Sequence, residues 1–169
     1  KMNELGLRPK EFFKVDIGDV VLDAWSIKPK DFDPQKKYPV IFHVYGEPAG
    51  STVQDNWGTG DNLWHQYLAN ELGTIVISID NRGTRVPRGR DFRKCIYRQI
   101  GLLAADDQAA AAKKIFTMYP FIDATHTGIW GWSGGGQMSL HCIFRHGDVF
   151  KSAIAIAFVA HQALYDNIY

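Results

Sequence analysis

The sequence predicts an α/β fold with a mostly parallel sheet, and two observations support this prediction. After residue 37, short apolar runs alternate with segments of helical character, in the order strand, helix, strand, helix, strand, helix, strand. The apolar runs are nearly continuous, which is typical of strands buried on both faces of a sheet. This alternation predicts parallel strands with helices on both faces of the sheet.

Length and composition are those of one ordinary globular domain. The chain has 169 residues, of which 46% are hydrophobic and 22% charged, and its net charge is +1. This balance gives no general attraction to nucleic acid or to a membrane surface. We expect no membrane span, because no apolar run approaches the roughly 20 residues that one needs. We also expect no signal peptide, because the first residues lack a basic and then apolar leader, and the compartment stays open.

The strands and helices follow from apolar periodicity and from glycine and proline. An antiparallel hairpin, with Gly18 and Asp19 in its turn, is expected at one edge of the sheet. Strands are predicted at residues 11–17, 20–27, 38–45, 74–80, 127–132 and 152–159, and helices at 61–72, 99–118 and 134–145. The apolar face of the first helix is expected to contain Trp64, Tyr67, Leu68 and Leu72. The segments 46–60 and 81–97 are expected to be irregular.

A nucleophile elbow is predicted between the strand at 127–132 and the following helix. The sequence Gly131-Trp132-Ser133-Gly134-Gly135 matches the pattern G-x-S-x-G, with apolar residues before it and a helix-compatible segment after it. The turn is so tight that its flanking residues approach neighbouring backbone, which glycine does without a Cβ clash. The alternative is a glycine-rich turn that merely begins a helix.

A serine nucleophile needs a base and preorganised donors for the oxyanion. The backbone N–H of Gly134 is one candidate donor, because it directly follows Ser133. The hydroxyl of Tyr45 is the other, because its strand should lie beside the elbow strand and bring Tyr45 to the same carboxyl edge of the sheet. The alternative interpretation of Tyr45 is an aromatic residue that simply ends a strand.

Four segments in order form a more specific pattern than the elbow alone. They are Tyr45-Gly46-Glu47-Pro48, Asp80-Asn81-Arg82-Gly83, Gly131-Trp132-Ser133-Gly134-Gly135 and Leu164-Tyr165-Asp166-Asn167-Ile168-Tyr169. In these segments and their order the chain resembles the prolyl oligopeptidase family, and it looks most like the dipeptidyl peptidase IV branch. The resemblance covers residues 12–169 and implies a truncated α/β-hydrolase fold.

The resemblance implies a serine peptidase that cleaves dipeptides from peptide N-termini, after proline or alanine, through an acyl-enzyme. It implies that Ser133 is the nucleophile and that the Tyr45 hydroxyl completes an oxyanion hole. It further implies that Val159, Tyr165 and Tyr169 shape the pocket for the residue before the scissile bond. No metal or cofactor is expected, and the sequence contains no H-E-x-x-H, Walker or G-x-G-x-x-G motif.

Residues 1–169 are expected to be a partial domain. In α/β-hydrolases the triad follows the order Ser, then Asp or Glu, then His. His141, His146 and His161 follow the serine, but none occupies the late loop that a triad histidine needs. The triad Asp and His are therefore expected in a C-terminal catalytic segment beyond Tyr169. The β-propeller that precedes this domain in the family is expected as a further part of the same protein.

Three positions depart from the family pattern. Gly134 stands where many relatives of dipeptidyl peptidase IV have a tyrosine, Gln162 where a tryptophan occurs, and Phe158 where a proline is usual. A strict preference for proline therefore stays open. The alternatives are an acylaminoacyl peptidase or an esterase of the same fold and, for the chain as given, a catalytically inert structural or interaction fragment.

Other features are expected to have structural roles. The basic stretch 81–98 is interpreted as a solvated loop that pairs with absent parts of the protein, rather than as a nucleic-acid site, because the rest of the chain is nearly neutral. Asp106 and Asp107 are expected to be solvated charges of a helix. The strand at 152–159 would be an exposed apolar edge, through which we expect self-association into a homo-oligomer.

Overall fold

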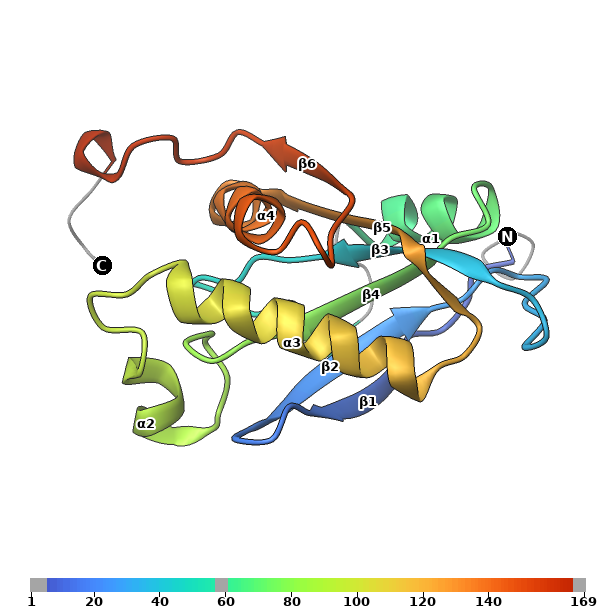
Figure 1. Ribbon diagram of the computed structural model, residues 1–169, viewed down its shortest axis with the longest axis horizontal. Helices are drawn as coiled ribbons and strands as arrows, with labels where there is room; N and C mark the ends of the chain where they lie inside the picture. The colour runs from blue at the N-terminus through green and yellow to red at the C-terminus, as the bar shows by residue number, and fades with distance from the viewer. Residues whose placement is uncertain (1–5, 57–60, 166–169) are drawn as a thin grey trace.

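A computed structural model describes residues 6–56 and 61–165 of the chain. Six strands form one sheet in the order β1-β2-β4-β3-β5-β6 (Figure 1). The strands are β1 (Glu11–Asp16), β2 (Val21–Ile27), β3 (Tyr38–His43), β4 (Ile75–Asp80), β5 (Ile122–Trp132) and β6 (Ser152–Ile156). The edges of the sheet are therefore β1 and β6.

The sheet is antiparallel at one end and parallel at the other. β1 pairs with β2 and β2 with β4 in antiparallel orientation, whereas β4, β3, β5 and β6 are parallel neighbours. The predicted edge hairpin and the predicted mostly parallel sheet are both confirmed. β3 lies directly beside β5, so the residues that follow these two strands reach the same carboxyl edge of the sheet.

Helices cover both faces of the sheet, as predicted. They are α1 (Asp61–Asn70), α2 (Gly89–Lys94), α3 (Leu102–Met118) and α4 (Gly134–Arg145), followed by the 3-10 helix η2 (Gln162–Leu164). α3 and α4 pack together over one face, and α1 packs on the other face against β2 and β4 (Figure 1). In β4, Ile75, Ile77 and Ile79 enter the core under α3 and α4, whereas Val76 enters the smaller core under α1.

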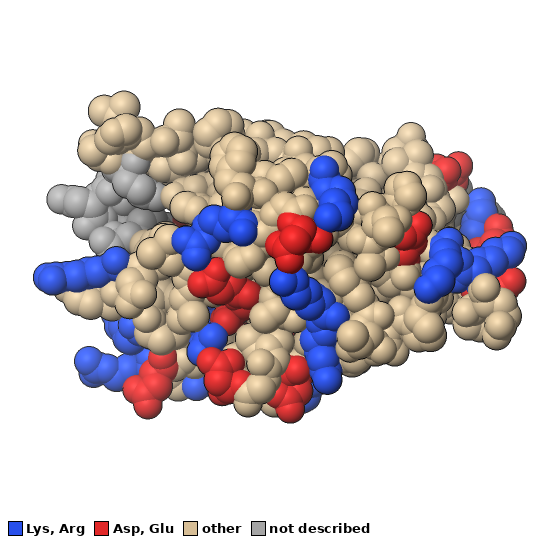
Figure 2. Space-filling view, viewed as in Figure 1, with Lys and Arg blue, Asp and Glu red and all other residues tan. Residues whose placement is uncertain are grey.

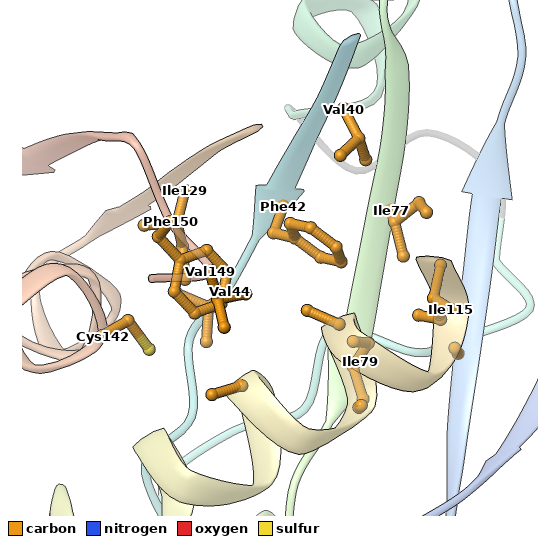
Figure 3. Packing of buried hydrophobic residues seen from close by; sticks show 14 of the residues in the cluster. Val40, Phe42, Val44, Ile77, Ile79, Ile115, Ile129, Cys142, Val149 and Phe150 are labelled. Carbon is orange, nitrogen blue, oxygen red and sulfur yellow. The ribbon is translucent and has the colours of Figure 1, made fainter. Parts of the chain in front are cut away.

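The larger core lies between the sheet and helices α3 and α4. Figure 3 shows Phe42 of β3 near Ile77 of β4, with Ile115 reaching toward them from α3. Phe42 also meets Phe150 edge to face, with ring centroids 5.6 Å apart. Small side chains let α3 lie close to the sheet, and the buried alanines of this helix are Ala104, Ala105, Ala109, Ala111 and Ala112.

Helix α1 buries a different face from the predicted one. Of the four apolar residues expected in the core, only Leu68 is buried, whereas Trp64, Tyr67 and Leu72 are exposed. His65 is buried instead, and its ring lies 5.2 Å from that of Trp25 and 5.5 Å from that of Trp130. The helix is thus rotated, because the aromatic side chains of the sheet pack on a histidine rather than on the larger apolar residues.

Other elements also differ from their predicted extents, and β6 ends at Ile156 rather than at residue 159. α2 interrupts the basic segment that was expected to be irregular, and it has no buried residues that could have given a periodic signal. β5 starts at Ile122, because Tyr38 of β3 pairs with this residue before an irregularity in the register. Among the described residues, none of the helices has the length and apolar character that a membrane crossing requires.

Candidate active site

Ser133 occupies a strained turn between β5 and α4. Its φ and ψ are 57° and −119°, and a residue with a side chain adopts such a positive φ at a cost of about 1–3 kcal/mol, where the surroundings impose it. The Ser133 N–H donates to the carbonyl of Ile156 at 2.9 Å, and its carbonyl accepts from the N–H of Gln137 at 3.1 Å. The predicted strand–turn–helix is present, with the serine at the turn.

Glycines allow the backbone to pack tightly around this serine. A Cβ atom at Gly131 would overlap with the carbonyl oxygen of Val44 and with the carbonyl group of Gly135. A Cβ atom at Gly135 would overlap with the same Val44 oxygen. Both clashes involve main-chain atoms that cannot swing aside, so the predicted close approach of the turn to neighbouring backbone is confirmed.

Tyr45 lies next to this turn. The N–H of Val44 donates to the carbonyl of Trp130 at 3.0 Å, which continues the pairing of β3 with β5 to their ends. A Cβ atom at Gly135 would lie 3.2 Å from the Cα of Tyr45, and a Cβ atom at Gly50 would lie 3.3 Å from the Tyr45 ring. The structure therefore brings the Tyr45 backbone to the first turn of α4, and the role of its hydroxyl stays a prediction.

Asp80, the last residue of β4, ties the loop after Tyr45 to the sheet. Its buried carboxylate accepts hydrogen bonds from the N–H of Thr52 at 2.8 Å, the N–H of Val53 at 3.1 Å and the Thr52 hydroxyl at 3.2 Å. Burial raises the pKa of Asp80, and the hydrogen bonds from Thr52 and Val53 oppose this rise. Thr52 and Val53 are thereby fixed beside the end of β4.

Asn81 holds the same loop closer to Tyr45. Its side-chain amide is fully buried and donates to the carbonyl of Gly46 at 3.0 Å. The oxygen of this amide accepts from the side chain of Gln108 on α3 at 3.0 Å, and Gln108 also donates to the carbonyl of Ile79 at 2.8 Å. A chain of buried hydrogen bonds thus connects α3 to the residue that follows Tyr45.

Arg82 joins the end of β4 to α3. It donates to Asp107 through Nε at 3.0 Å and Nη2 at 2.6 Å, and through Nη1 to Asp19 at 2.7 Å. The hydrogen bonds to Asp107 raise the pKa of Arg82. Asp107 is 1% exposed, so the prediction of a solvated charge is wrong for this residue. Arg82 likewise pairs inside the chain, contrary to the prediction for the basic stretch, whereas the neighbouring Asp106 forms its ion pairs at the surface.

Gly134, the predicted backbone donor, is buried at the start of α4 beneath Glu47. A Cβ atom at Gly134 would overlap with Cδ and Oε2 of Glu47 and would lie 2.8 Å from Oε1. Glu47 is itself 4% exposed. The carboxylate of the Tyr45 loop therefore lies directly over the residue that follows the serine, at the positive end of the helix dipole.

The predicted pocket residues follow β6, where the chain is open to solvent. Val159 is partly exposed, Tyr165 is 51% exposed, and Tyr169 lies outside the described residues. Phe158 packs near the elbow, since a Cβ atom at Gly136 would lie 3.0 Å from the Phe158 Cβ. Figure 1 shows the chain continuing from β6 past α4 toward the C-terminus. The structure joins Phe158 to the elbow and leaves Tyr165 at the surface.

The three histidines that follow the serine each have a separate location. His141 lies on α4 against Gly101, where a Cβ atom would lie 2.7 Å from Nε2, and burial lowers its pKa. His146 interacts with Asp106 at 2.9 Å, and His161 is exposed after β6. Within the described residues the Ser133 hydroxyl makes no hydrogen bond to a histidine.

The described part of the chain contains no group of three or more His, Cys, Asp or Glu residues that could hold a metal ion. Cys95 and Cys142 are free thiols, and burial raises the pKa of Cys142 to about 12. At the elbow the structure places Ser133 at the N-cap of α4.

Sequence reasoning missed the residues that support the elbow. Asp80 and Asn81 were identified only as part of a family motif, and Glu47 had no assigned role. A signal for the first two does exist, because polar residues at the end of a buried strand, or directly after it, lie at the carboxyl edge where loops must be held. No signal in the sequence places the Glu47 carboxylate over Gly134, since that contact joins the loop after β3 to the start of a helix far away in the chain.

Comparisons with known proteins all indicate the same family. Residues 60–169 match the model of the prolyl oligopeptidase family. The chain is 34% identical over 168 residues to a "Probable dipeptidyl-aminopeptidase B" of Arthroderma otae, and 36% identical over 170 residues to one of Ajellomyces capsulatus. It superposes on the crystal structure of Porphyromonas gingivalis dipeptidyl peptidase 4 with a TM-score of 0.88 and 41% sequence identity.

The matched proteins are much longer than this chain. The alignments cover 99% and 100% of the chain but 18% of each fungal relative. The superposition covers 96% of the chain and 22% of the Porphyromonas gingivalis protein. The chain therefore spans about a fifth of the length of the proteins to which it is similar.

Proposed function

The chain belongs to the prolyl oligopeptidase family, and we propose that it is part of the catalytic domain of a serine peptidase that removes dipeptides from peptide N-termini. The observation that carries this proposal is Ser133 at a positive φ, between a buried parallel strand and α4 and next to the Tyr45 loop. The names of its relatives, dipeptidyl-aminopeptidase B and dipeptidyl peptidase 4, support the choice of a dipeptidyl peptidase over an esterase.

In this proposal Ser133 attacks the carbonyl carbon of the scissile peptide bond. A base takes the hydroxyl proton as the new C–O bond forms, and negative charge moves to the carbonyl oxygen. The N–H of Gly134 and the hydroxyl of Tyr45 donate hydrogen bonds to this oxyanion. The C–N bond then breaks, the base returns its proton to the leaving amine, and the dipeptide stays on Ser133 until water releases it.

The remaining catalytic groups come from other parts of the protein. The base and the carboxylate that orients it are a His and an Asp in a segment after residue 169, so residues 1–169 are the first part of the catalytic domain. A β-propeller of the same protein binds the free amino group of the substrate. The chain 1–169 alone is therefore inactive in this proposal.

Val159, Tyr165 and Tyr169 form the pocket for the residue before the scissile bond. A pocket of this kind needs walls from several segments, and the exposure of Tyr165 fits a wall that is completed by the rest of the protein. Gly134 contributes no ring to the pocket, so alanine is accepted at this position as well as proline.

A fluorophosphonate probe tests the nucleophile in the full-length protein. We expect stoichiometric labelling at Ser133, none in Ser133→Ala, and none in the chain 1–169. Absence of labelling in the full-length protein would refute the peptidase. Hydrolysis of Gly-Pro and Ala-Ala anilides distinguishes the dipeptidyl peptidase from its alternatives, because faster cleavage of acyl-peptides or simple esters would identify an acylaminoacyl peptidase or an esterase.

A further inference from the structure

The glycines around Ser133 are required for two different reasons. At Gly131 and Gly135 a Cβ atom would overlap with the main-chain oxygen of Val44. At Gly134 the three nearest atoms all belong to the carboxylate of Glu47, and the φ of Gly134 is not in the left-handed region. The nearest obstacle to a side chain at residue 134 is therefore another side chain, whereas at Gly131 and Gly135 it includes the backbone.

Glu47 belongs to the loop that carries Tyr45, and this loop rests on the first turns of α4. Gly46 has a φ of 78° and packs so closely on Met138 of α4 that a Cβ atom would lie 2.9 Å from Met138 Cε. Glu47 then covers Gly134, one turn earlier in the same helix. Because Glu47 is only 4% exposed, its carboxylate cannot move unless neighbouring groups shift as well.

We propose that Glu47 is a positioning residue that fills the space over Gly134 and holds the Tyr45 loop against the N-terminus of α4. This inference rests on the proposed function, because the position of Tyr45 matters to the rate only if its hydroxyl binds the oxyanion. A side chain at residue 134 and the Glu47 carboxylate cannot both be present in this arrangement, since they would occupy the same space.

The test is a double-mutant cycle in the full-length peptidase. Gly134→Ala displaces the carboxylate, and we expect kcat to fall about 100-fold with KM changed less than about threefold, because the oxyanion contact is made only in the transition state. Glu47→Ala alone removes the filling group and lowers kcat about tenfold. The double variant should recover to the level of Glu47→Ala, because the alanine methyl group then has room.

Gly135→Ala is the matched control in the same helix turn. Its clash is with the Val44 carbonyl, so combination with Glu47→Ala should give no recovery. Thermal unfolding of every variant separates a displaced loop from an unfolded domain, since the proposal expects Gly134→Ala to stay folded with only the modest loss of Tm that overpacking causes. Recovery of both glycine variants, or of neither, would overturn the proposal.

Glu47→Gln separates shape from charge. The amide has the same size as the carboxylate, so we expect kcat within about threefold of the wild type. A loss as large as that of Glu47→Ala would assign the effect to the charge and overturn a filling role. If the wild type neither hydrolyses dipeptide anilides nor labels with fluorophosphonate, the proposed function fails. If it does both but the cycle shows no recovery, the function stands and this inference alone fails.

Discussion

The two sides of Ser133 are built in different ways. On the side of β3, the carbonyl of Val44 packs against the glycines of the turn, and buried side chains of Asp80 and Asn81 hold the loop that follows Tyr45. On the side of β6, no charged residue occurs from position 152 to 165, and the edge of the molecule that runs along β6 is almost free of Lys, Arg, Asp and Glu (Figure 2). Large apolar side chains are exposed there, namely Ile154, Phe158, Leu164 and Tyr165.

This difference shows which part of the site the chain specifies by itself. A strained serine persists only when its surroundings impose the strain, and the groups that hold this turn lie in residues 44–53, 80–82 and 131–137 and at Ile156 of β6, whose carbonyl accepts from the Ser133 N–H. A substrate pocket instead needs walls from several segments. The strained turn is therefore formed within this chain, whereas the apolar side chains on and after β6 are exposed to solvent.

Replacement of Tyr45, on the β3 side of Ser133, should have the largest effect on activity. In the full-length peptidase we expect Tyr45→Phe to lower kcat about 100- to 1,000-fold with little change in KM, because one oxyanion donor is lost. Steady-state kinetics with a dipeptide anilide measure this. Tyr165→Phe, on the β6 side of Ser133, is the matched control, since it also removes only a hydroxyl group. We expect it to change kcat less than about threefold. Equal losses in the two variants would contradict the division of roles.

The ion pair between Arg82 and the buried Asp107 should have the next largest effect, which is on stability. Asp107→Ala leaves the Arg82 guanidinium without its main partner, and we expect the free energy of unfolding to fall by about 2–3 kcal/mol. The loss stays below that of a fully buried pair because Arg82 is partly exposed and keeps Asp19. Urea unfolding followed by tryptophan fluorescence measures the loss.

Asp106→Ala is the control for this prediction, one residue earlier in the same helix. Its ion pairs with Arg145 and His146 are at the surface, and we expect less than about 1 kcal/mol. Similar losses in both variants would mean that burial of Asp107 is not what stabilises the contact between α3 and the end of β4.

Much of the β3 side of Ser133 could be predicted from the sequence, because the patterns that indicate its strands and its turn are local. Continuous apolar runs identified β3 and β5, and the spacing of glycines around Ser133 identified the turn. The rotation of α1 could not be predicted, because it depends on aromatic rings of the sheet that favour His65 over Trp64. The contact of Glu47 with Gly134 could not be predicted either, since no periodicity connects the loop after β3 to the first residue of α4.

His65, on the buried face of α1, makes the stability of the fold depend on pH. Burial, followed by the charges of His43 and Lys10, lowers the pKa of His65 to about 3. The unfolded chain binds a proton near its ordinary pKa of 6.5, so stability is complete above that pH and falls as the pH decreases toward 3. The slope is at most about 1.4 kcal/mol per pH unit. Urea unfolding at several pH values should show a flatter profile for His65→Gln than for the exposed His161→Gln, and identical profiles would exclude His65 as the source.

The edge strand β6 gives the smallest expected effect, on association rather than on rate. An unpaired edge with apolar side chains pairs with another chain, and the Ile154 side chain is 56% exposed on this strand. We expect the chain 1–169 to associate in a concentration-dependent way and Ile154→Lys to weaken this association, as measured by light scattering. Leu63→Lys, at an exposed apolar position of α1 on the other side of the sheet, should leave it unchanged. A clean monomer at high concentration would show that β6 is protected without a partner, and the contrast between the two sides of Ser133 would then be one of charge and packing alone.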